Sequence, residues 1–86
     1  MARRSGWGGA LPADDDEAAQ RIVAAARRIV EETGRAASVS EVTRELQITR
    51  QTVYRYFPGV EALTNAVAID IGTEIGEMLT SQLAGI

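Results

Sequence analysis

The 86-residue sequence contains no cysteine, no histidine and no lysine, so all nine of its cationic side chains are arginines. The absence of cysteine excludes disulfides, thiolate nucleophiles and zinc sites that use cysteine ligands. The absence of histidine removes the commonest general base and the commonest metal ligand. Only carboxylates remain for acid–base work, and we therefore expect a protein that is not an enzyme and that binds neither a metal nor another cofactor.

Long apolar runs are also missing. No stretch approaches the roughly 20 uninterrupted apolar residues of a membrane span, and the first twelve residues lack the apolar run of about 7–15 residues found in a signal peptide. We therefore expect a soluble, cytoplasmic protein with no membrane partner. The net charge of −3 argues at first against a nucleic-acid partner as well.

Apolar residues at spacings of three and four predict an all-α chain. The first helix is expected from about Asp15 to Thr33, after a run of acids that suits the positive end of a helix and before Gly34, a typical left-handed terminus. A short second helix is expected after Ser38, because Ser38 and Glu41 have the spacing of a capping box.

Two further helices follow a three-residue interruption at Gln47-Ile48-Thr49. Thr49 is a good cap for a third helix over Arg50–Phe57, which Pro58-Gly59 then ends. A long fourth helix is expected from Val60 onward. The chain then divides into a flexible N-terminal arm (1–13), a helix-turn-helix domain (14–59) and a connecting helix (60–86).

Two short helices joined by a three-residue turn, with a longer helix on each side, form a helix-turn-helix pattern, in which the second helix of the pair enters a major groove. Val53 and Phe57 are four residues apart and are expected to face the core. The opposite side of the third helix then carries groups that suit base edges and phosphates. These groups belong to Arg50, Gln51, Thr52, Tyr54, Arg55 and Tyr56. For Tyr56 we expect a packed ring with an outward hydroxyl.

The segment over residues 21–68 resembles the N-terminal DNA-binding domain of the TetR family of bacterial transcriptional repressors. The most specific part is Ile48-Thr49-Arg50-Gln51-Thr52-Val53-Tyr54-Arg55-Tyr56-Phe57 followed by Glu61-Ala62-Leu63, which is similar to the family pattern V-S-x-x-T-L-Y-x-Y-F…K-E-x-L. The resemblance implies a three-helix, homeodomain-like bundle followed by a long connecting helix. It also implies a homodimer that binds a double-stranded DNA operator, and a further C-terminal domain, absent from this chain, that binds a small-molecule inducer.

The resemblance also implies residue roles. Base-reading roles fall on Arg50, Gln51, Thr52 and Tyr54, and phosphate-binding roles fall on Ser38, Ser40, Thr49, Arg55 and Tyr56. The sequence departs from the family pattern at two instructive positions. Val60 replaces a phosphate-binding lysine, and Gln47 replaces a glycine in the turn, so that Gln47 either adopts a left-handed conformation or changes the turn.

Other interpretations remain open at the level of the sequence. The apolar stripe of the fourth helix is also typical of a helical protein-interaction module. Asp70, Glu74 and Glu77 have the spacing of one helix side, which favours a solvated face over a catalytic or metal site. Arg3 and Arg4 suit a minor-groove arm as well as a disordered tail. The charge supports DNA binding once it is counted segment by segment, because residues 20–58 hold seven arginines against four acids.

Overall fold

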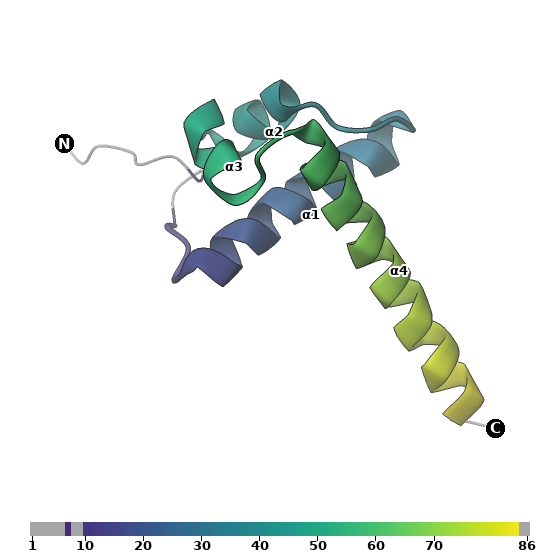
Figure 1. The fold of residues 1–86 in the computed structure, drawn as a ribbon. Helices are drawn as coiled ribbons and strands as arrows, with labels where there is room; N and C mark the ends of the chain where they lie inside the picture. Colours follow the sequence, from purple (N-terminus) through teal and green to yellow (C-terminus); the bar gives the residue numbers. More distant parts are fainter. Residues whose placement is uncertain (1–6, 8–9, 85–86) are drawn as a thin grey trace.

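The computed structural model describes residue 7 and residues 10–84, and within them it contains four helices and no strand. The helices are α1 (Asp15–Thr33), α2 (Val39–Leu46), α3 (Arg50–Tyr56) and α4 (Val60–Ala84). The first three helices and the start of α4 pack together, and the rest of α4 extends away from the bundle (Figure 1). Arg3 and Arg4 lie outside the described residues.

The core takes one fully buried large side chain from each helix. These are Ile22, Val42, Val53 and Leu63, in order from α1 to α4. Around Ile22 the buried positions of α1 include three alanines, whose small side chains let the neighbouring helices approach closely. The helical spacing of apolar residues in the sequence therefore identifies the buried faces.

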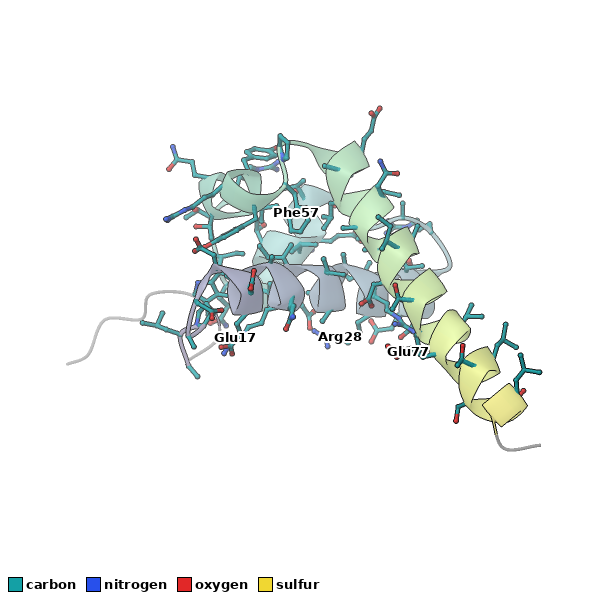
Figure 2. All side chains as sticks on the ribbon, turned by 60° about the horizontal axis from the view of Figure 1, so that its bottom comes forward. Glu17, Arg28, Phe57 and Glu77 are labelled. Atoms are coloured by element: carbon teal, nitrogen blue, oxygen red, sulfur yellow. The ribbon has the colours of Figure 1, made fainter. Side chains whose placement is uncertain are left out.

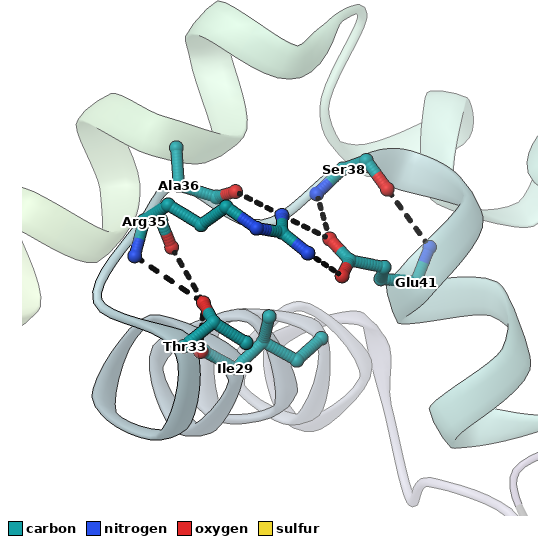
Figure 3. Close-up of polar contacts among 6 residues, drawn as sticks. All are labelled: Ile29, Thr33, Arg35, Ala36, Ser38 and Glu41. Atoms are coloured by element: carbon teal, nitrogen blue, oxygen red, sulfur yellow. Dashed lines mark hydrogen bonds and ion pairs between the residues drawn. The ribbon is translucent and has the colours of Figure 1, made fainter.

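The predicted ends of α1 and α2 are confirmed. Gly34 ends α1 in the left-handed region with φ 75°. At the start of α2, the Ser38 hydroxyl accepts from the Glu41 amide, and the Glu41 carboxylate accepts from the Ser38 amide at 2.9 Å. Arg35 adds an ion pair to the same carboxylate at 2.8 Å, and Figure 3 shows how the three side chains meet. The first turn of α2 is thus fixed by its own cap and by the loop before it.

The turn between α2 and α3 contains a left-handed residue that is not a glycine. Gln47 adopts the left-handed conformation, with φ 59° and ψ 46°, and its amide donates to the Thr43 carbonyl. Thr49 then caps α3 by accepting from the Thr52 amide. Of the two alternatives for Gln47, the structure shows the left-handed residue.

The predicted C-terminus of α3 is wrong by one residue. Helix α3 ends at Tyr56, and Phe57 is extended with φ −135° and ψ 106°. The physical reason is Pro58, whose ring excludes the helical region for the residue before it. The Phe57 side chain still packs against the core, as predicted, and Figure 2 shows it directed into the bundle.

Helix α4 is fastened to α1 by residues from its start to just past its middle. Leu63 and Val67 are buried, and the Arg27 guanidinium on α1 forms ion pairs with Asp70 at 3.0 Å and Glu74 at 2.9 Å. Two of the three acids that formed one helix side in the sequence are therefore bound to an arginine. The hydrogen bonds that Arg27 donates to Glu74, Asp70 and Glu31 raise the pKa of Arg27.

The second half of α4 exposes large apolar side chains. Ile75, Met78, Leu79 and Leu83 are between 51% and 71% exposed. Gly72 and Gly76 lie on the same stretch, and a side-chain carbon added at either would meet no atom within 4 Å. Across the described ranges, no helix combines the length and the hydropathy that crossing a membrane requires.

The residues just before α1 are joined to it. The Arg21 guanidinium donates to the Ala10 carbonyl at 2.6 Å, and the Ala13 amide donates to Glu17 at 2.7 Å. Trp7 packs against the core as a half-buried side chain. Part of the segment that the sequence assigns to an arm therefore contacts the bundle.

Candidate nucleic-acid interface

Four arginines of the bundle are neutralised by carboxylates. Arg21 pairs with Glu17 at 2.7 Å, and Arg28 pairs with Glu45 at 2.9 Å. Arg27 and Arg35 form the ion pairs with α4 and α2 described above. All four side chains belong to α1 or to the loop that follows it.

The other three arginines of the described chain form no ion pair within it. They are Arg44 on α2 and Arg50 and Arg55 on α3, and all three are exposed. Within the part of the chain that the structure describes, the positive charge that remains available to a partner is thus concentrated on the two helices of the helix-turn-helix. A polyanion that approaches α2 and α3 therefore meets cations that no carboxylate compensates.

Arg50 occupies the first position of α3 and reaches back to α2. Its Nη2 atom donates a hydrogen bond to the Ser40 hydroxyl. Because that acceptor is neutral, the guanidinium keeps its full charge. The structure thus brings together two predicted site residues that lie ten positions apart in the sequence.

Next to Arg50, the start of α3 presents the other predicted base-reading residues. Gln51 is exposed, and Tyr54 is 43% exposed one turn from Arg50. Thr52 is half-buried, and its hydroxyl lies 2.9 Å from the hydroxyl of the cap residue Thr49. Gln51 and Tyr54 are therefore free to meet base edges, whereas the hydroxyls of Thr49 and Thr52 share a hydrogen bond with each other.

The end of α3 is tied to the start of α1. The Tyr56 ring packs against the core, and its hydroxyl donates to the Asp15 carboxylate at 3.1 Å. Desolvation, and then that hydrogen bond to Asp15, raise the pKa of Tyr56. The Arg55 guanidinium lies 5.8 Å from the centre of the same ring, within the range of a cation–π contact. The packed ring confirms the prediction, whereas the sequence does not predict the bond to Asp15.

Ser38 differs from the other predicted phosphate ligands. Its hydroxyl and amide are both used in the capping box at the start of α2, and in the described chain no hydrogen bond links it to another predicted site residue. Its hydroxyl proton is still available to a phosphate oxygen.

Arg44 is a further candidate, which is not among the site residues predicted from the sequence. It lies one helical turn after Ser40, so the two share one side of α2. The signal was present in the sequence, since the first helix of a helix-turn-helix crosses the DNA backbone and an arginine there suits a phosphate.

The comparisons with known proteins agree with this geometry. Residues 22–67, more than half of the chain, match the family described as bacterial regulatory proteins, tetR family. The chain has no match among curated proteins or solved structures. The matched region contains α2, the turn and α3 together with the core that supports them. The chain therefore belongs to the tetR family of bacterial regulatory proteins and is a DNA-binding transcriptional regulator.

Proposed function

We propose that the chain recognises a specific double-stranded operator with the exposed side of α3 and contacts the DNA backbone with α2 and the ends of α3. In this proposal Arg50, Gln51, Thr52 and Tyr54 read base edges. Ser38, Thr49 and Arg55 contact phosphates, Arg44 joins that group, and Tyr56 does so when its hydroxyl turns from Asp15 to the DNA. Ser40 lies against Arg50. The phosphate contacts set the register, and the base contacts supply the specificity.

The distribution of arginines carries the proposal. The cations of α1 are paired with carboxylates, whereas Arg44, Arg50 and Arg55 form no ion pair in residues 10–84. A merely solvated surface gives no reason for that division. A surface that binds phosphate needs unpaired cations, because a cation already paired with a carboxylate releases few counterions from DNA.

Three finer aspects belong to the same proposal. The regulator is a repressor, it acts as a homodimer, and a small-molecule inducer releases it from DNA. Residues 14–59 are the DNA-binding unit, residues 1–13 are an arm, and residues 60–86 connect this unit to a ligand-binding and dimerisation domain. The exposed apolar residues of α4 support this division, because such a surface is normally covered by another element.

The same exposed surface supports the rival function, a helical protein-interaction module. Leu79→Asp and Arg50→Ala separate the two functions. Both positions are exposed, so neither substitution disturbs the core. In the 86-residue chain, DNA binding predicts that Arg50→Ala weakens binding to the selected duplex and Leu79→Asp does not. The rival predicts that Leu79→Asp weakens binding to a protein partner and Arg50→Ala does not.

The direct test is fluorescence anisotropy of a labelled duplex, selected from a random library, measured at several salt concentrations. We expect the logarithm of the binding constant to fall linearly with the logarithm of the salt concentration, by about 0.9 for each phosphate neutralised. Binding that is independent of salt would refute the proposal.

A further inference from the structure

We propose that Ser40 is a positioning residue, which holds Arg50 in the conformation that reads a guanine near the start of α3. The inference rests on the proposed function and deepens it. It replaces the phosphate-binding role that the family resemblance implies for Ser40, and it identifies one base of the operator by its chemistry.

The Arg50 side chain bridges the two helices. The residue is exposed at the first position of α3, and Ser40 is half-buried at the second position of α2. The Ser40 hydroxyl accepts from Nη2 of Arg50. A guanidinium has five N–H groups, and among the described residues no other hydrogen bond uses those of Arg50. Guanine needs two N–H donors, for its O6 and N7 atoms.

The acceptor is neutral, and this separates Arg50 from the arginines of α1. Arg28, for example, lies 2.9 Å from the Glu45 carboxylate. A carboxylate would cancel the charge and compete with guanine for the fork of the guanidinium. A hydroxyl fixes the direction of the side chain and leaves its charge for the partner.

Both ends of the bridge are fixed. Ser40 lies in the first turn of α2, where the capping box and Arg35 hold Glu41 (Figure 3). The Ser40 carbonyl also accepts from the Thr43 hydroxyl at 2.7 Å. On the other side, Thr49 caps the first turn of α3. Preordering a long side chain between two rigid helices is worth about 2- to 10-fold in binding, because its rotamer entropy is already lost.

The experiment uses the 86-residue chain and the duplex that it selects from a random library. Binding is compared on four duplexes that differ only at one position. That position is the guanine whose replacement weakens binding most in the wild type and least in Arg50→Ala. We expect Arg50→Ala to lose about 5- to 150-fold of the preference for guanine. We expect Ser40→Ala to lose about 2- to 10-fold of it. Ser40→Thr, which keeps the hydroxyl, restores the preference. In the Arg50→Ala background, Ser40→Ala has no further effect on it.

Ser81→Ala is the matched control, since it makes the same change at an exposed position of α4. It should leave the preference unchanged. The melting temperature of Ser40→Ala should be no lower than that of the wild type, because alanine is the better helix former and, in the described residues, the serine hydroxyl has no hydrogen bond other than that with Arg50.

Two results would overturn the proposal. One is a Ser40→Ala chain that binds all four duplexes more weakly by the same factor and with a shallower salt dependence, which is the behaviour of a phosphate ligand. The other is a Ser40→Ala chain that keeps the whole preference for guanine. If the library yields no bound duplex at all, the proposed function fails, and this proposal fails with it. In the two results above a bound duplex exists and only the role of Ser40 fails, so the two failures are distinguishable.

Discussion

One residue type serves two purposes in this chain. Arg35 closes the loop after α1 by pairing with Glu41, whereas Arg50 and Arg55 keep their charge exposed. Arginine suits both purposes, since its planar fork fits a carboxylate, a phosphate or a guanine. What separates the two groups of arginines is whether the fold brings a carboxylate to them.

Glu41 makes the acid stability of the bundle testable. Hydrogen bonds from the Arg35 side chain and the Ser38 amide lower the pKa of Glu41 from its ordinary 4.5 to about 2. A carboxylate with a lowered folded-state pKa contributes stability that is present above the unfolded value and is lost as pH falls through the folded value. We expect the melting temperature of the wild type to fall between pH 4.5 and about 2, and to fall less in Glu41→Gln.

Glu32→Gln is the control for this titration, because Glu32 is exposed and forms no ion pair in the part of the chain that the structure describes. The control should keep the acid dependence of the wild type. Equal slopes for the wild type and Glu41→Gln would contradict the role given to Glu41.

At the scale of the elements, the turn between α2 and α3 sets the angle at which α3 is presented. Gln47 holds that turn in the left-handed region, where a non-glycine residue costs roughly 1–2 kcal/mol. Gln47→Gly removes this cost but increases the backbone entropy of the unfolded chain, which offsets about 0.5–1 kcal/mol. The net expectation is a gain of about 0.5–1 kcal/mol in the free energy of unfolding, measured by urea denaturation.

The control for Gln47→Gly is Gln51→Gly, which makes the same change at an exposed position inside α3. There the backbone is already right-handed, so glycine should lower the free energy of unfolding by roughly 1 kcal/mol. A loss in Gln47→Gly of similar size would mean that the turn in solution is not left-handed.

The elements could be predicted from the sequence wherever the cause is local. The caps at Ser38 and Thr49 act over three residues, and the core stripe of α1 follows from spacing alone. Even the error at Phe57 has a local cause, the proline that follows it. By contrast, the bonds from Arg27 to Asp70 and from Tyr56 to Asp15 join residues more than forty positions apart. They depend on how the helices cross, so the sequence could not say which arginines remain unpaired.

For the whole molecule, the net charge of −3 conceals a separation of charge. Residues 59–86 hold four acids and no arginine, whereas residues 20–58 hold seven arginines against four acids. Two acids of α4 bind Arg27, and an acid of α2 binds Arg28. The carboxylates therefore quench the positive field of α1 but leave that of α2 and α3. An acidic protein can in this way present a basic surface to DNA.

Arg44 and Arg28 allow this separation to be tested, since replacing either by alanine changes the net charge equally. If total charge governed binding, both variants would weaken it alike. If the unpaired cations govern it, Arg44→Ala should weaken binding to every duplex and reduce the salt slope by about 0.9. Arg28→Ala frees the Glu45 carboxylate on α2 and can weaken binding too, but it should leave the slope unchanged, because Arg28 contacts Glu45 and no phosphate. Anisotropy titrations of the two variants on one duplex measure both slopes. Equal slopes would show that α2 does not lie against the phosphate backbone, since only the position of the lost charge differs between the variants.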